Sequence, residues 1–202
     1  RWQSLVCWMS QPADDEAVRE NAADLEDISA SLDGDELAYE RIVRRYQQQV
    51  GKYVWKFTND RTDHEDLVHA VFVDAYLGLA KFRGEGSFRS WLLTIATRVG
   101  YAYWKRRARD RKRNVVSLES APEPSSDATA QEEHPELERL QKAIEKLSAR
   151  DRLVVTLMYF EERSVAETAE LTGWSQSMVK VQAHRARKRL KKLLDRENHE
   201  RQ

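Results

Sequence analysis

The chain has 202 residues, of which 41% are hydrophobic and 34% are charged, so it is too apolar for a fully disordered chain and too charged for a membrane protein. Its single Cys excludes a disulfide framework, a zinc finger and an iron–sulfur cluster built from this chain alone. The 34 Lys and Arg residues balance the 34 Asp and Glu residues, and we expect a cytoplasmic protein because we find neither a secretory signal nor an apolar run of about 18 residues.

The first 33 residues are predicted to be a partly disordered tail. Residues 1–36 hold only two basic residues against ten acidic ones. Met9 is a candidate native start, so residues 1–8 are left out of the fold prediction. A short helix is expected around Ala17 to Ile28, within a segment that we expect to be mobile.

Residues 34–118 are predicted to form a block of helices. Three apolar patterns with helical spacing follow one another. Their members are Leu37, Ile42, Val43, Tyr46 and Val50, then Leu67, Val68, Val71, Phe72, Ala75, Tyr76 and Leu79, then Trp91, Leu92, Ile95 and Val99. Thr62 with Glu65 predicts a capping box before the second helix, and Ser87 predicts the cap of the third. The third helix is expected to run on through the basic stretch that ends at Arg113.

Residues 119–134 are predicted to be a flexible linker. The segment is rich in Pro, Ser and Ala and shows no apolar period. Seven acidic residues and no basic one lie between Glu119 and Glu138. The linker separates the first block from a second one at residues 135–194.

The second block is also predicted to be helical, with a helix-turn-helix at its end. Its first helix carries Leu137, Leu140, Ile144 and Leu147 on one face. Ser148 with Asp151 and Ser164 with Glu167 are two further capping-box patterns. Ala169 allows a close helix approach, Gly173 can end its helix with positive φ, and Val179 faces inward on the next helix. We find no convincing strand pattern in the chain.

The last helix is a candidate for the major groove of DNA. Its predicted outward residues are Gln176, Ser177, Lys180, Val181, Gln182, His184 and Arg185, and seven basic residues lie between Lys180 and Lys192. Polar and basic side chains on such a helix can contact base edges and phosphates. The alternative is an ordinary helical hairpin with a solvated basic face. We favour DNA binding because the basic run lies on the recognition helix itself.

Residues 81–113 carry aromatic and cationic side chains together. The aromatic ones are Phe82, Phe88, Trp91, Tyr101, Tyr103 and Trp104, and the cationic ones include Arg83, Arg89, Arg98, Lys105, Arg106 and Arg107. This mixture suits single-stranded nucleic acid, although Phe88 and Trp91 are favoured as core residues. A block suited to unstacked bases beside one suited to duplex DNA indicates opening of DNA near a bound site.

Two other function classes were weighed. The cluster Asp63, His64, Glu65, Asp66 and His69 invites a metal site, but His64 and His69 are five residues apart and diverge on a helix. A polar helix start is the better interpretation, and no catalytic residue, metal, cofactor or small-molecule substrate is predicted. A stand-alone helix-turn-helix transcriptional regulator would use only the second block and leave the first one unexplained.

The motifs, in their order and spacing, resemble the extracytoplasmic-function (ECF) sigma factors of bacterial RNA polymerase over residues 34–194. In the first block the matching residues are 35–40, Tyr46, 66–68, Val71, Phe72, 82–92, Ile95 and Ala96. In the second they are 147–152, Ala166, Glu167, Gly173, Val179, Lys180 and 184–187. The resemblance implies an all-α fold, in which a sigma-two-like helical bundle at 34–118 is joined by the acidic linker at 119–134 to a sigma-four-like helix-turn-helix domain at 135–194.

The resemblance also implies roles for individual residues. The polymerase contacts, on the beta-prime clamp helices, would be Asp66, Leu67, Val68, Val71 and Phe72. The minus-ten contacts would be Gly84, Glu85, Ser87, Phe88, Trp91, Arg98, Lys105, Arg106 and Arg107. The minus-thirty-five contacts would be Gln176, Ser177, Lys180, Val181, His184 and Arg185.

The resemblance further implies that the chain is an alternative sigma factor with three partners. These are core RNA polymerase, through its clamp helices and its beta flap, promoter DNA, and an anti-sigma factor, either soluble or membrane-anchored. The anti-sigma factor would cover apolar residues such as Val68, Phe72 and Leu79. His69, Arg98 and Val181 depart from the residues that are common in the family at their positions.

Overall fold

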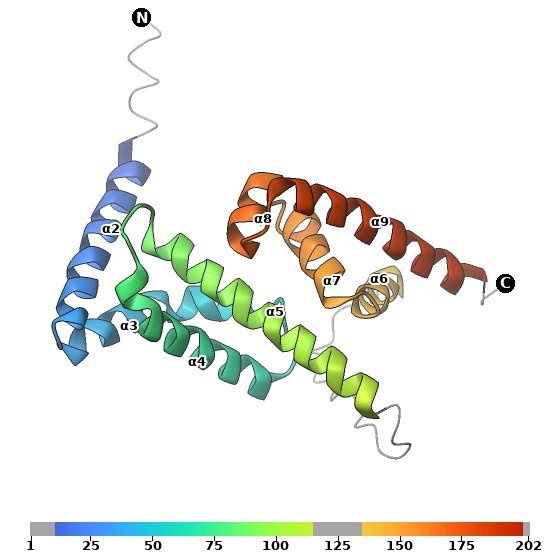
Figure 1. The fold of residues 1–202 in the computed structure, drawn as a ribbon, viewed down its shortest axis with the longest axis horizontal. Coiled ribbons are helices and arrows are strands. Elements are labelled where there is room, and N and C mark those ends of the chain that lie inside the picture. Colours follow the sequence, from blue (N-terminus) through green and yellow to red (C-terminus); the bar gives the residue numbers. More distant parts are fainter. Residues whose placement is uncertain (1–10, 115–134, 200–202) are drawn as a thin grey trace, which may run out of the picture. The chain divides into compact units, whose positions relative to one another are not determined.

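The structure is a computed structural model that describes residues 11–114 and 135–199. Within these ranges every regular element is helical, which confirms the all-α prediction (Figure 1). The elements are α2 (Gln11–Leu32), α3 (Glu36–Val54), α4 (Arg61–Gly78), η1 (Leu79–Lys81), α5 (Phe88–Asn114), α6 (Pro135–Glu145), α7 (Ala149–Val155), η2 (Thr156–Phe160), α8 (Val165–Thr172) and α9 (Gln176–His199). In the part of the chain so described, no helix is both long and apolar enough to span a bilayer. The expected linker at 119–134 lies outside the described residues.

The described chain forms two compact units. The first contains α2, α3, α4, η1 and the start of α5, up to Ala96. The second contains residues 56–61, the remainder of α5 and helices α6 to α9.

Helix α3 supplies the centre of the first unit. Ile42, Tyr46 and Val50 are buried, as their spacing of four residues predicts. Leu37, which was expected on the same face, is 64% exposed. Five residues turn a helix by about 140°, so Leu37 lies off the stripe that Ile42 begins.

Helix α2 includes the short helix expected around Ala17 to Ile28, but it is longer and belongs to the first unit. It continues to Leu32, and its last turns carry three buried side chains, those of Asp24, Asp27 and Ile28. The two carboxylates are buried because Arg41 and Arg45 of α3 bind them. The C-terminal half of α2 is therefore part of the first unit.

Two helix starts in this half of the chain were tested by the structure. The Ser87 hydroxyl oxygen accepts a hydrogen bond from the Ser90 N–H (3.2 Å), so the predicted cap of α5 is confirmed. Helix α5 runs to Asn114, through the basic stretch as expected. Helix α4 begins at Arg61, so Thr62 lies inside its first turn rather than at the predicted N-cap position.

Within the second unit, α5 has a close contact at Gly100. The ring of Phe57 lies so close to the helix backbone there that a Cβ at position 100 would be 2.3 Å from the Phe57 Cγ atom. The Trp104 indole N–H donates to the Phe57 carbonyl oxygen at 2.7 Å. The missing side chain of Gly100 therefore lets residues 56–61 pack against α5.

Helices α6 to α9 form their own core around Leu147, Val155 and Ala186. Partly buried Leu190 and Leu193 extend this core along α9. The predicted DNA-binding residues lie in the first turns of α9, directly after the α8–α9 turn.

Candidate functional site

The α8–α9 turn has the local geometry that its sequence predicts. Ser164 and Glu167 form a complete capping box at the start of α8. Hydrogen bonds from the Ser164 hydroxyl and backbone, with one from Arg163, hold the pKa of Glu167 below its ordinary value. Gly173 ends α8 in the left-handed region with φ 70°, and the Ser175 hydroxyl accepts from the Met178 N–H in the first turn of α9 (3.2 Å). The chain therefore forms a helix, a tight turn and a second helix.

Helix α9 divides into a buried face and an exposed face. Val179, Ala183 and Ala186 are buried. The six residues predicted to contact the minus-thirty-five element are all exposed, namely Gln176, Ser177, Lys180, Val181, His184 and Arg185. The structure thus places the whole predicted set on the outside of one helix.

Gln182 is the exception to the outward residues expected on α9. It is buried at 7% exposure, because three- and four-residue steps place it beside Val179 and Ala186. Its amide donates to a carboxylate oxygen of Asp151, which is fully buried. The Ser148 hydroxyl (2.7 Å) and the guanidinium of Arg189 also bind Asp151. This Asp151 cluster anchors α9 to the start of α7.

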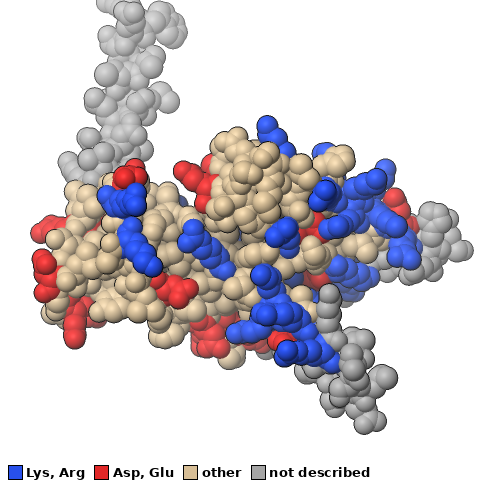
Figure 2. Space-filling model, in the orientation of Figure 1, with Lys and Arg blue, Asp and Glu red and all other residues tan. Residues whose placement is uncertain are grey.

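Lys and Arg side chains gather over the C-terminal half of α5, and separately over α9 (Figure 2). The four cations of α5 predicted to contact the minus-ten element are all exposed, Arg98 in the first half of the helix and Lys105, Arg106 and Arg107 in the second. The Arg107 guanidinium donates to the Tyr103 hydroxyl at 2.8 Å. Tyr103 and Trp104 are themselves buried, so these two rings support the helix and are not free to stack on bases.

The loop between η1 and α5, residues 83–87, is exposed over its whole length. Gly84, Glu85 and Ser87 are all open to solvent. Phe88 was predicted to contact DNA, but it is fully buried, and Trp91 is half-buried. Because the Phe88 ring packs against neighbouring aromatic rings, it supports the loop and cannot present its face to a base.

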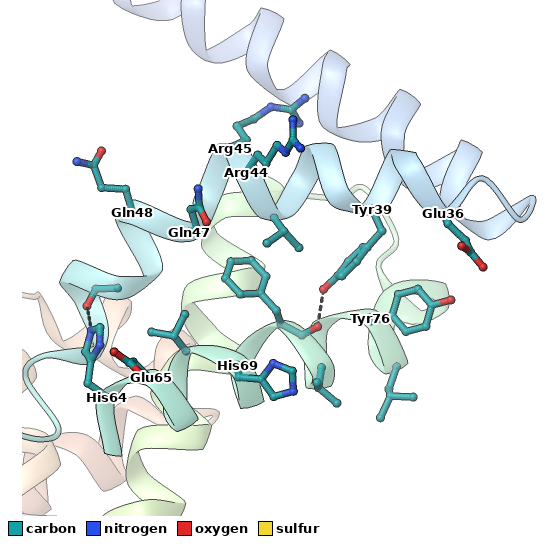
Figure 3. A pocket seen from close by; sticks show the side chains of 16 residues that line it. Glu36, Tyr39, Arg44, Arg45, Gln47, Gln48, His64, Glu65, His69 and Tyr76 are labelled. Atoms are coloured by element: carbon teal, nitrogen blue, oxygen red, sulfur yellow. Dashed lines mark hydrogen bonds between the residues drawn. The ribbon is translucent and has the colours of Figure 1, made fainter. Parts of the chain in front are cut away.

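A groove of about 1220 Å³ lies between α3 and α4 (Figure 3). Of the five predicted polymerase contacts, Leu67, Val71 and Phe72 are buried in the core, Val68 is half-buried and Asp66 is exposed. The apolar periodicity of α4 therefore marks mainly its core side. The exposed apolar residues that sequence reasoning did not assign to a binding surface are Val73 and Leu77, with Tyr76, and all three line the groove. Their spacing of three and four residues, continued from His69, was the available signal.

The groove is braced by contacts between α3 and α4. The Tyr39 hydroxyl donates to the Phe72 carbonyl oxygen, and the rings of Tyr39 and Tyr76 lie 4.9 Å apart. Burial raises the pKa of the Tyr39 hydroxyl well above its ordinary value, so it remains a donor. At the other end, His64 stacks on Trp55 at 3.9 Å, and its Nε2 lies 3.0 Å from the Gly51 carbonyl oxygen. Among the described residues, no group of His, Cys, Asp and Glu side chains could hold a metal ion.

Family models and relatives match both blocks of the chain. The model "Sigma-70 region 2" matches residues 42–110, and "Sigma-70, region 4" matches residues 137–190. The RNA polymerase sigma factor YlaC of Bacillus subtilis is 32% identical over 163 residues, covering 80% of this chain and 94% of that protein. The ECF RNA polymerase sigma factor SigM of Mycobacterium tuberculosis is 28% identical over 180 residues, covering 87% of both.

Solved structures show the same fold. CnrH, in complex with the cytosolic domain of CnrY, is 25% identical, with a TM-score of 0.51, and the match covers 86% of this chain and 97% of CnrH. The region 2 match also leaves the alternative of a stand-alone regulator without support, since such a protein would need only the second block. The chain belongs to the extracytoplasmic-function sigma factors, and it is an alternative sigma factor that binds core RNA polymerase and directs promoter-specific transcription initiation.

Proposed function

We propose that the two domains divide the work of initiation, with boundaries at residues 34–118 and 135–194 and with residues 119–134 as the connecting linker. The second domain reads the minus-thirty-five element, and the first docks on core polymerase and opens the minus-ten element. The observation that carries this proposal is the exposed face of α9, where six polar, basic or small apolar side chains stand opposite a face anchored on Asp151.

Helix α9 has the chemistry for the major groove. Gln176 and Ser177 stand in its first turn, and Lys180, His184 and Arg185 follow along the exposed face. Amide and guanidinium groups read base edges, while Lys and Arg also bind phosphates. The methyl groups of Val181, which is half exposed, suit contact with a thymine methyl group.

The exposed loop at residues 83–87 and the basic half of α5 have the chemistry for an opened strand. An unstacked base can enter the loop, where backbone and short polar side chains are accessible. Arg98 and the three consecutive cations from Lys105 to Arg107 then bind the adjacent phosphates. Phe88 and Trp91 keep the loop in shape from inside the domain.

The groove between α3 and α4 is the proposed docking site for the beta-prime clamp helices. Val73, Tyr76 and Leu77 offer exposed apolar area, and Leu77 is 72% exposed. Helical partners bind such grooves through apolar side chains at helical spacing. The buried Leu67, Val71 and Phe72 shape the groove from below, and the beta flap is the proposed partner of the second domain.

We infer that an anti-sigma factor, soluble or membrane-anchored, covers these surfaces in the resting state. CnrH was solved with the cytosolic domain of CnrY, and RpoE of Bartonella quintana was solved with the anti-sigma factor NepR. The chain works in the bacterial cytoplasm, takes no cofactor and catalyses no bond chemistry of its own, because the polymerase supplies the catalytic site.

The test compares two kinds of variant in reconstituted holoenzyme. The double change Lys180→Ala with Arg185→Ala should weaken binding of a minus-thirty-five duplex by about tenfold or more and reduce its salt dependence, while core binding stays unchanged. Leu77→Asp should do the reverse. Lys142→Ala, which removes an exposed cation of α6 bound to Glu138, is the matched control. Equal loss of both activities in either variant would refute the division of labour.

A further inference from the structure

Helix α2 lies outside the residues that the region 2 model matches, which begin at residue 42. Its described part is firmly attached to the first unit, and it reaches the loop at residues 83–87 by two separate routes. We propose that α2 is a positioning element for this loop, and that through it α2 supports opening of the minus-ten element. The inference rests on the proposed promoter role of the loop.

The attachment of α2 is a buried cluster of charges. Asp24 and Asp27 are almost fully buried, and between them they bind the side chains of Arg41, Arg45 and Tyr46 on α3. The distances from Asp27 to Arg41 and to Arg45 are both 2.7 Å. Burial alone would raise the pKa of Asp27, but the hydrogen bonds and charges of the two arginines outweigh it and lower the pKa. The cluster therefore fixes both the position and the rotation of α2 on α3.

The first route runs through the aromatic rings that flank the loop. The Tyr46 hydroxyl donates to Asp24, and the Tyr46 ring lies 5.6 Å from the ring of Phe88. Phe88 in turn lies 5.5 Å from Phe82. Phe82 and Phe88 stand immediately before and after the loop. The buried charge cluster of α2 is therefore linked, through Tyr46, to the two rings that flank the loop.

The second route is the close approach of Leu25 on α2 to the loop itself. Gly84 has φ 71°, and a Cβ there would lie 3.4 Å from the Cδ2 atom of Leu25 on α2. Leu25 remains 43% exposed, so its side chain lies beside the loop at the protein surface and is not part of the deep core. Helix α2 also contacts η1, which leads into the loop.

These contacts matter because an exposed loop must be ordered before it can hold a base. Each residue that is ordered only on binding takes free energy from the interaction. A loop that α2 already holds at Gly84 and at its aromatic ends binds the displaced strand with less of this cost. Helix α2 itself touches no DNA in this scheme, and its residues are positioning residues.

The test compares Leu25→Ala with Leu32→Ala, which shortens an exposed leucine two helical turns further along the same helix. Hydrogen exchange of the full-length protein should be faster at the amides of residues 84–88 in Leu25→Ala only. The single strand for the binding assay is selected by wild-type holoenzyme from a pool randomised over the minus-ten positions. Holoenzyme that contains Leu25→Ala should bind this strand about three- to tenfold more weakly than wild-type holoenzyme does. Core affinity and minus-thirty-five duplex affinity should not change, and Leu25→Met should restore strand binding.

The outcomes separate the inference from the function on which it rests. Glu85→Ala, in the loop itself, should change strand affinity or base preference, and if it changes neither, the proposed role of the loop fails. If Glu85→Ala acts but Leu25→Ala behaves like Leu32→Ala, the loop role stands and the inference about α2 is overturned. If Leu25→Ala lowers core and duplex binding equally with strand binding, its role is general stability and the inference is likewise overturned.

Discussion

Replacing Asp151 with alanine should destabilise the second domain, because it removes the acceptor that anchors the recognition helix. Asp151 is fully buried and accepts hydrogen bonds from Gln182, Ser148 and Arg189. Two of these partners can turn to water, since Ser148 is exposed and the Arg189 side chain is 59% exposed. Gln182 is buried, so its amide would be left without an acceptor.

The magnitude follows from these exposures. An unsatisfied buried amide costs about 1–3 kcal/mol. The ion pair with Arg189, whose side chain is 59% exposed, contributes about 1 kcal/mol, and the Ser148 hydroxyl a similar amount. We therefore expect Asp151→Ala to lower the free energy of unfolding by about 2–4 kcal/mol.

The assay is urea unfolding of the full-length protein, followed through a probe in the second domain. Glu170→Ala, which removes an exposed carboxylate from α8, is the matched control and should change stability by less than about 0.5 kcal/mol. Binding of the minus-thirty-five duplex should also weaken when it is measured without urea, at a temperature where the variant is folded. A loss of stability below about 1 kcal/mol would mean that the buried hydrogen bonds do not anchor α9.

Three further predictions concern other parts of the chain. The pKa of Asp27 is lowered from its ordinary value of 3.8, so the stability that it contributes is present above this pH and is lost as the pH falls through the lower folded value. Urea titrations from about pH 5 downward should show this loss, and Asp27→Asn should remove it. Ser164→Ala should cost about 1 kcal/mol in urea unfolding, and a cost near zero would contradict the capping role. Gly100→Ala should lower the free energy of unfolding by about 2 kcal/mol or more, and with it the melting temperature, because its Cβ would overlap the buried Phe57 ring; an unchanged melting temperature would contradict the close contact.

The second domain could be predicted from sequence because its signals are local. A serine and an acid three residues apart define a helix start, and a glycine defines a helix end, without help from the rest of the chain. The structure confirms the Ser164 box and the left-handed Gly173. Gln182 was misplaced because a polar side chain normally indicates an exposed position, and the buried carboxylate that accepts its hydrogen bond, Asp151, lies 31 residues earlier.

Helix α2 could not be predicted as part of the first unit for the same physical reason. Ten acidic residues near the start of a chain normally indicate a solvated segment. Asp24 and Asp27 are buried only because Arg41 and Arg45, 14 to 21 residues away, compensate their charge. Composition reports charge but does not report which charges are paired in space.

The docking groove shows a second limit of sequence patterns. Periodicity on α4 correctly located an apolar stripe, but Leu67 and Val71 turned out to serve the core. A stripe that faces the protein and a stripe that faces a partner have the same spacing, and only packing against α3 separates them. Val73 and Leu77 are candidates for a partner contact only because nothing in the described first unit buries them.

In both domains a buried carboxylate holds a helix on which the proposed function depends, and this arrangement gives orientation beyond stability. Apolar contacts are non-directional and tolerate rotation of a helix, whereas a wrongly rotated helix would leave Asp151 buried and unpaired. Five residues separate Lys180 from Arg185 by about 140° around the helix, so a rotation of α9 by one residue, about 100°, would turn one of these two side chains toward the buried face. Orientation and stability can therefore be separated experimentally.

The separating variant replaces both partners, Asp151→Leu with Gln182→Leu. Removing donor and acceptor together leaves no unsatisfied group, so this variant should regain most of the stability that Asp151→Ala loses. Its affinity for the minus-thirty-five duplex should stay reduced, because apolar packing alone does not fix the rotation of α9. Urea unfolding and duplex titration on the same samples measure the two effects. If affinity recovers together with stability, the Asp151 cluster acts through stability alone, and the orientation argument for α9 is wrong.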